Sequence, residues 1–173
     1  KMMNFPHLSI SFDVDETRKL EVSVENCTIP AKSFENEQST LFILGTPILG
    51  DNIVYDEIWA EVTDAGLPSN FLRKINGEFL LITLDKESGT LRISTDRYTS
   101  IPLYYVIDDS GLFGSVFYKD VWKYVNRNNR SKLNEHAVFE FLWLQRLLGT
   151  KTYDSSSAFL LAATTLTYRS GTT

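Results

Sequence analysis

Two features of the sequence consist of residues whose chemistry could serve a function. Cys27 is the single cysteine of the chain, and a cysteine thiolate can act as a nucleophile. Asp96 and Arg97 are adjacent, and a carboxylate beside a guanidinium could bind a polar ligand. A free cysteine is also commonly a small core residue, so we interpret Cys27 as a buried or half-buried strand residue. The two histidines, His7 and His136, are too few and too isolated to indicate a metal site, and we expect His136 at or near the surface.

Asp96-Arg97 lies within a stretch that predicts a four-stranded antiparallel meander. Residues 79–84 form an apolar run of strand length, and a polar turn leads into the alternating residues 91–94. Pro102 cannot donate to a sheet ladder, so it should open the next strand, 103–107. The turn after that strand should lead back into 112–117.

The part of the chain before this meander predicts strands and short helices. Residues 8–14 and 20–24 alternate between apolar and polar side chains and predict a hairpin. Residues 31–40 are polar and predict a loop. Residues 41–44 predict a short buried strand, stopped by Gly45 and Pro47. Helices are expected over 54–65, with Gly66 as the stop, and over 68–73.

The part after the meander predicts two helices and a final strand. The first helix is expected over 119–125, and the second runs from Glu135 to about Leu148 with Asn134 as its N-cap. The spacing of five residues places them on one face of the second helix. That face consists of Val138, Phe141, Leu142, Gln145 and Leu148. Residues 158–168 should form the last strand.

Composition bounds the class of protein. The chain has 173 residues, 43% of them apolar and 13% aromatic, which suffices for one domain with a substantial core. The net charge of −5, with both signs mixed along the chain, gives no basic stripe for nucleic acid. No apolar run approaches the roughly 20 residues of a membrane-spanning helix, and the N-terminus lacks a signal-peptide core. One cysteine excludes a disulfide framework and any multi-cysteine metal site. We therefore expect a soluble, cytoplasmic protein with no metal and no nucleic-acid partner.

Three blocks of residues carry a resemblance to a known family. They are Gly77-x-Phe79 with Asp85, then Asp96-Arg97-Tyr98-x-x-x-Pro102-Leu103-Tyr104-Tyr105, then Phe113-Gly114-Ser115. In order and spacing they resemble the glutaminase domain of asparagine synthetases, whose middle block usually reads Asp-Arg-Phe-Gly-x-Lys-Pro-Leu-Tyr-Tyr. Thr99, Ile101 and Val116 depart from the family pattern, so the chain resembles a diverged relative.

The resemblance implies an α+β fold of the N-terminal-nucleophile hydrolase type. This fold is a four-layer αββα sandwich of two antiparallel sheets with helices outside. It also implies that residues 1–173 form one glutaminase-like domain, the N-terminal part of a longer asparagine-synthetase-like chain. The eight residues expected to carry the structural motif of the family are Gly77, Phe79, Asp96, Arg97, Pro102, Leu103, Tyr104 and Tyr105.

The catalytic residues of the family do not map onto this sequence. The family uses its first residue, a cysteine, as the nucleophile, whereas this chain begins with Lys1-Met2. Cys27-Thr28-Ile29 is faintly similar to the family's opening, but only 50 residues separate Cys27 from Gly77, against roughly twice that in the family. Asn76-Gly77-Glu78 is similar to an oxyanion-hole motif, but its position predicts a turn and strand start instead. The family's substrate-carboxylate clamp has no counterpart between residues 26 and 71. No catalytic residue is therefore predicted.

The remaining motif residues are interpreted as structural. The resemblance implies that Asp96 and Arg97 hold the meander by hydrogen bonds and lie near the contact with a following synthetase domain. Tyr104 and Tyr105 should be core or domain-interface aromatics, as should the stripe of Tyr118, Trp122 and Tyr124.

The functional hypothesis is a degenerate glutamine amidotransferase-like domain of an ATP-dependent, amide-forming protein related to asparagine synthetase. It would act as scaffold and interface for a C-terminal synthetase domain, in cis or in trans, with a homodimer as a second possible association. ATP and Mg are expected only for that synthetase domain, and this chain should hold no cofactor. The alternatives are an active glutaminase with an unrecognised nucleophile and a free-standing interaction module.

Overall fold

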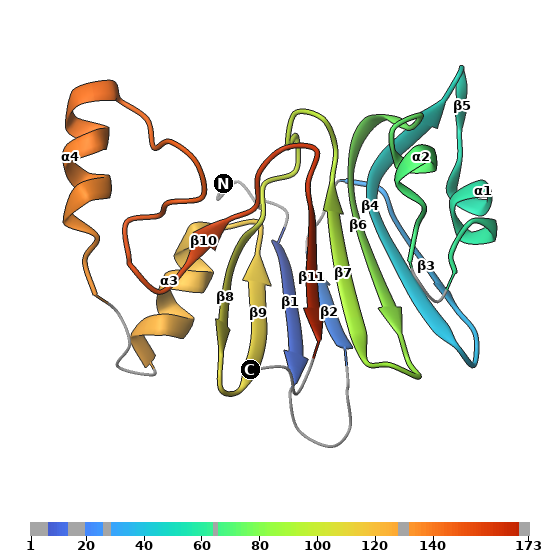
Figure 1. The fold of residues 1–173 in the computed structure, drawn as a ribbon, viewed down its shortest axis with the longest axis horizontal. Helices are drawn as coiled ribbons and strands as arrows, with labels where there is room; N and C mark the ends of the chain where they lie inside the picture. Colours follow the sequence, from blue (N-terminus) through green and yellow to red (C-terminus); the bar gives the residue numbers. More distant parts are fainter. Residues whose placement is uncertain (1–6, 14–19, 26–28, 64–65, 128–131, 170–173) are drawn as a thin grey trace. The chain divides into compact units, whose positions relative to one another are not determined.

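A computed structural model describes residues 7–13, 20–25, 29–63, 66–127 and 132–169 of the chain (Figure 1). The chain divides into two compact units. Unit 1 consists of Lys1–Cys27 and Pro102–Leu161, and unit 2 of Thr28–Ile101 and Ala162–Thr173. Each unit contains one antiparallel sheet with helices, so the predicted α+β class with two antiparallel sheets is confirmed. The stacking of four layers and the single domain over residues 1–173 stay predictions.

Unit 1 is built on a five-stranded sheet with the strand order β10-β8-β9-β1-β2. The strands are β1 (His7–Asp13), β2 (Leu20–Glu25), β8 (Tyr104–Asp108), β9 (Gly111–Ser115) and β10 (Ala158–Phe159). The predicted N-terminal hairpin is confirmed, since β1 and β2 pair antiparallel with Ile10 opposite Val22. Helix α3 (Tyr118–Arg127) packs on β8 and β9, where Val121 and Val125 are buried against Val106.

Helix α4 (Glu135–Leu144) completes unit 1. The predicted cap is confirmed, because Asn134 Oδ1 accepts a 3.2 Å hydrogen bond from the N–H of Ala137. The helix ends earlier than expected because Gln145 adopts a left-handed conformation, with φ of 56°. Ala137 is its one buried residue, and Leu142 is exposed. Apolar residues lie on nearly all sides of this helix, so their spacing could not single out a core face.

Unit 2 is built on a six-stranded sheet with the order β11-β7-β6-β4-β3, and β5 pairs with β4. The strands are β3 (Ala31–Glu35), β4 (Ser39–Leu49), β5 (Asn52–Ile53), β6 (Asn76–Asp85), β7 (Thr90–Thr95) and β11 (Thr165–Arg169). Helices α1 (Tyr55–Ala60) and α2 (Ser69–Leu72) lie between β5 and β6 in the sequence. The core of unit 2 joins Leu41 and Ile43 of β4 to Ile58 of α1 and Phe79 of β6. Each such buried side chain contributes roughly 2 kcal/mol.

The predicted four-stranded meander is wrong, although its four strands exist. β6 and β7 form a hairpin in the unit 2 sheet, with Ile82 opposite Ile93. β8 and β9 form a second hairpin in the unit 1 sheet. The free edge of β7 is taken by β11, and β9 pairs with β1. Strands distant in the sequence therefore occupy the edges that a meander would need.

The predicted loop over residues 31–40 is also wrong, because it contains β3. This strand pairs with β4 from Ala31 opposite Leu44 to Glu35 opposite Thr40. Most side chains of β3 are exposed, which explains why the segment has the polar composition of a loop. Asn36 Oδ1 accepts hydrogen bonds from the N–H groups of Gln38 and Ser39 and closes the turn.

Strand β4 continues through Gly45 and Pro47, which were expected to end it. The N–H of Gly45 donates to the Pro30 carbonyl at 2.7 Å and therefore points toward the side of β3. Backbone directions alternate along a strand, so the nitrogen of Pro47, two residues later, faces the same side. The pairing with β3 ends at Leu44, opposite Ala31. A proline at position 47 therefore removes no hydrogen bond from that ladder.

Two further boundaries differ from expectation. Helix α1 ends at Ala60, and Thr63 then pairs with Gly66 in an isolated antiparallel bridge, in which the N–H of Gly66 donates to the Thr63 carbonyl at 2.7 Å. The Thr63 hydroxyl also bonds the Gly66 carbonyl, so side-chain bonding competes with the helix here. The single strand expected over 158–168 is two strands, β10 and β11, in different sheets. Within the described residues, no helix is long and apolar enough to cross a membrane.

Candidate functional site

The loop after β7 is organised by the Asp96 carboxylate, which is 2% exposed. Asp96 Oδ1 accepts a 2.7 Å hydrogen bond from the N–H of Tyr98, and Oδ2 accepts one of 3.2 Å from the N–H of Phe79. The N–H of Ser100 donates to both oxygens. The N–H of Ala163 donates to the Asp96 carbonyl, which brings the segment before β11 to the same place. The carboxylate therefore fixes the backbone, and its acceptor capacity is used by amides.

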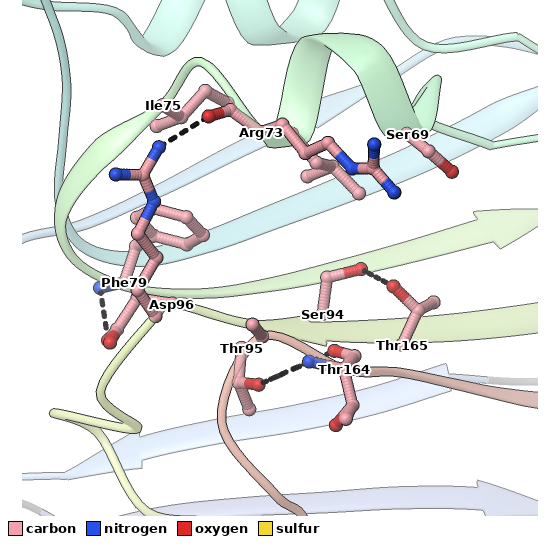
Figure 2. Close-up of a pocket in the computed structure, with 12 residues that line it drawn as sticks. Ser69, Arg73, Ile75, Phe79, Ser94, Thr95, Asp96, Thr164 and Thr165 are labelled. Carbon is pink, nitrogen blue, oxygen red and sulfur yellow. Dashed lines mark hydrogen bonds between the residues drawn. The ribbon is translucent and has the colours of Figure 1, made fainter.

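Two arginines lie on this loop and on the end of α2. An Nη of Arg97 donates a short hydrogen bond to the carbonyl oxygen of Arg73, the residue that ends α2. The guanidinium of Arg73 has no hydrogen bond or ion pair with the part of the chain that the structure describes. Figure 2 shows the Arg73 side chain extending toward Ser69 at the other end of α2.

These residues border a cavity of about 230 Å³ in unit 2. Its floor carries a row of hydroxyl groups from β7 and from the segment that enters β11 (Figure 2). Ser94 Oγ and Thr165 Oγ1 lie 2.8 Å apart, and the N–H of Thr164 donates to Thr95 Oγ1. The apolar part of the lining consists of Leu72, Ile75, Phe79 and Ala163.

The chemistry of this cavity suits binding better than bond cleavage. The hydroxyl groups of Ser94 and Thr165 bond to each other and that of Thr95 bonds to the backbone, and the lining contains no histidine or lysine that could activate a hydroxyl group. Among the described residues, no group of three or more His, Cys, Asp or Glu could hold a metal ion. Guanidinium and hydroxyl donors around one cavity are groups that can bind an oxyanion.

The structure brings together three of the residues singled out from the sequence. Phe79, Asp96 and Arg97 all line the cavity. Gly77 lies apart from it, at the start of β6 opposite Pro47. Its φ is 92°, and a Cβ there would lie 2.1 Å from the Thr46 carbonyl oxygen, so glycine is required by the close approach of β4. Asn76-Gly77-Glu78 is thus the beginning of a strand, as predicted.

The remaining motif residues belong to unit 1. Pro102 precedes β8, and the carbonyl of the buried Leu103 accepts a 2.8 Å hydrogen bond from the N–H of Leu160. Tyr104 packs against Phe159, with ring centroids 5.3 Å apart. Tyr105 lies opposite Ala158 in the pairing of β8 with β10. Cys27 lies outside the described residues.

Sequence reasoning missed Ser69, Arg73, Thr164 and Thr165, which complete the cavity. Arg73 is 24 residues from Arg97, and Thr165 is 71 residues from Ser94. No local spacing relates them, because they meet through α2 and through the pairing of β11 with β7. The repeat Thr164-Thr165 beside a strand start is the one local feature that hints at a hydroxyl wall.

Unit 1 carries a second feature, an exposed apolar surface on α4. We call the side chains of Phe139, Leu142, Trp143, Leu144 and Leu148 the α4 surface. Trp143 is 85% exposed, Leu142 63% and Phe139 60%. A series of aromatic ring contacts begins at Phe141 of α4, which packs edge to face against Tyr153 with ring centroids 5.8 Å apart. Tyr153 contacts Tyr118, which in turn contacts Tyr104.

No curated protein matches the chain. A family model described as a glutamine amidotransferase domain matches residues 56–118. The match spans α1 to β9 and therefore includes α2, Asp96 and Arg97 from the cavity wall, while Thr164, Thr165 and α4 lie beyond it. Residues 56–118 of this chain thus indicate a glutamine amidotransferase-like domain.

Proposed function

We propose that this chain is a non-catalytic glutamine amidotransferase-like domain. It supports the synthetase domain of an ATP-dependent, amide-forming protein related to asparagine synthetase, in cis or in trans. ATP and Mg belong to that synthetase domain. The observation that carries the proposal is the α4 surface, which we assign as the docking face for the synthetase domain.

The α4 surface has the composition of an interface. Large apolar patches on soluble proteins mark interaction sites, and aromatic residues are enriched in the buried centres of interfaces. Leu142 and Trp143 are adjacent and largely exposed. The two acidic residues of α4 are Glu135 and Glu140, and Glu140 is engaged with Lys151. Its apolar side chains therefore favour an apolar partner face.

The α4 surface is also held in place before any partner binds. Asn134 caps the helix, and Glu140 Oε2 accepts a 3.2 Å hydrogen bond from the N–H of Leu148. Lys151 Nζ lies 3.0 Å from Glu140 Oε1, so the segment after the helix folds back on it. A surface that is ordered beforehand loses less conformational entropy on association.

The family-motif residues support a structural rather than a catalytic role. Asp96 directs both carboxylate oxygens to backbone amides, and Gly77 serves the close contact of β4 and β6. The Asn76-Gly77-Glu78 segment has its backbone in the β6 ladder. These contacts give the motif residues a role in the fold, which supports the proposal.

The test measures association with the synthetase domain encoded in the same gene or genome. Leu142→Ser should weaken that association by about tenfold or more, as expected for a central interface residue. The matched control is Ile53→Ser in unit 2, because Ile53 is a similarly exposed aliphatic residue, at 55%. No association in the unsubstituted protein, or equal effects of the two variants, would overturn the docking assignment.

Glutamate release from glutamine separates this proposal from an active glutaminase. We expect no release above background from the purified chain. Release that disappears in Cys27→Ala would show an active amidotransferase and contradict the non-catalytic role.

A further inference from the structure

The unit 2 cavity is lined by the guanidinium of the exposed Arg73, which forms no ion pair with the described residues. Arg73 lies at the end of α2, which places it beside the cavity, and its carbonyl oxygen accepts a hydrogen bond from Arg97. Its guanidinium has no partner among the described residues, so all of its N–H donors are available to a ligand.

Hydroxyl donors lie on the walls around this guanidinium. Figure 2 shows Ser69 beside Arg73, and it shows the Ser94–Thr165 pair on the floor of the cavity. Ser94 and Thr165 share one hydrogen bond, which uses one hydroxyl hydrogen and leaves the other free to donate. The Ser69 hydroxyl has no bond with the described residues. A planar carboxylate suits such an arrangement, since a guanidinium can bind both of its oxygens at once.

The net charge of the residues that line the cavity indicates which charge a ligand should carry. Arg73 and Arg97 supply two positive charges and Asp96 one negative charge, which leaves one positive charge. A single carboxylate balances this charge, whereas a phosphate dianion would exceed it. The cavity volume of about 230 Å³ and the apolar side chains of Leu72 and Phe79 allow a short apolar body beside the charged group.

We infer that this cavity is a binding site for a small monocarboxylate with a short apolar body. The carboxylate is bound by Arg73 with help from Ser69 and the Ser94–Thr165 pair, and the apolar body lies toward Phe79. This site goes beyond the proposed docking role, because it lies in unit 2 and uses none of the residues of the α4 surface.

Ligand-observed NMR and calorimetry on the whole chain test the inference with three probes. Isovalerate carries a carboxylate on a short apolar body, isovaleramide is its uncharged counterpart of the same shape, and inorganic phosphate is the competing oxyanion. We expect isovalerate to bind and isovaleramide to bind at least about tenfold more weakly, since the charge-assisted bonds are lost.

Three variants locate the binding. Arg73→Gln should lower isovalerate affinity about tenfold or more, and Ser69→Ala should lower it by a smaller factor. The control is Lys74→Gln, which removes the same charge from the neighbouring exposed residue outside the lining and should leave the affinity unchanged. Circular dichroism on each variant confirms that it is folded.

Four outcomes would overturn the assignment. They are equal binding of acid and amide, no isovalerate binding at millimolar concentration, preference for phosphate, and equal effects of Arg73→Gln and Lys74→Gln. Isovalerate binding lost in Arg73→Gln and kept in Lys74→Gln would support it.

Discussion

The hydroxyl of Tyr118 donates a 2.9 Å hydrogen bond to Asp154 Oδ2 and thereby ties helix α3 to the segment that leads into β10. Asp154 is 2% exposed, and its Oδ1 accepts hydrogen bonds from the N–H groups of Ser156 and Ser157. The Thr152 hydroxyl donates to the Asp154 carbonyl. A buried carboxylate with this many donors is the fixed point of the segment.

Removal of this carboxylate should destabilise the protein strongly. Asp154→Ala leaves several buried donors without an acceptor and should lower the free energy of unfolding by about 3 kcal/mol, whereas Tyr118→Phe removes one hydrogen bond and should cost about 1 kcal/mol. Urea denaturation measures both values. Asp51→Ala, at an exposed aspartate, is the control, and a loss in Asp154→Ala no larger than in that control would contradict the prediction.

The same pair predicts a loss of stability at alkaline pH. Burial and the adjacent Asp154 carboxylate raise the pKa of the Tyr118 hydroxyl above its ordinary value, which is about 10. The contribution of this hydroxyl is therefore complete below the pKa of the unfolded state and is lost as pH rises above it, because the unfolded tyrosine ionises first. The free energy of unfolding should fall above about pH 10, and fall less in Tyr118→Phe. Denaturation at a series of pH values tests this, and identical slopes in the two proteins would count against it.

Gly77 should be intolerant of any side chain. Gly77→Ala places a Cβ against the Thr46 carbonyl at a φ of 92° and should cost at least about 3 kcal/mol in unfolding free energy. Gly50→Ala is the matched control, because Gly50 also has a positive φ, of 63°, but has open space around the Cβ position. It should cost only about 1 kcal/mol. Thermal and urea denaturation separate the two, and similar losses would show that the contact with β4 is unimportant.

Asp96→Asn should loosen the loop after β7, because it replaces the carboxylate with a neutral amide of nearly the same size. The amide has one oxygen, so it cannot accept from both the Tyr98 and Phe79 N–H groups, which now bond different carboxylate oxygens. We expect a loss of about 2 kcal/mol and faster hydrogen exchange at the N–H groups of Tyr98 and Ser100. Unchanged exchange at those two amides would mean that the carboxylate does not hold the loop.

The two hairpins of the central region could be predicted from the sequence, because each is specified locally. Residues 86–89 and 108–111 are turn-forming, and the strands on either side alternate or are continuously apolar. The division of these hairpins between two sheets could not be predicted. It depends on β11 pairing with β7 and on β1 pairing with β9, and neither partner is near in the sequence.

The candidate site shows the same division. Asp96 and Arg97 were recognisable as a pair, because their chemistry is adjacent in the chain. Arg73 stood beside Lys74 in a short polar stretch, and nothing in that stretch indicates that its guanidinium borders a cavity. The exposure of the α4 surface could not be predicted for a different reason. Apolar residues lie on nearly all sides of this helix, so their spacing does not show which side is buried.

Strand β3 has a consequence for the behaviour of the protein at high concentration. It is the end strand of the unit 2 sheet, it is only five residues long, and its Lys32 and Glu35 side chains are exposed. If another molecule extended the sheet at this strand, its backbone would lie beside these charged side chains, which disfavour such pairing. The polar composition that makes β3 resemble a loop is therefore also its protection against the growth of aggregates from this strand.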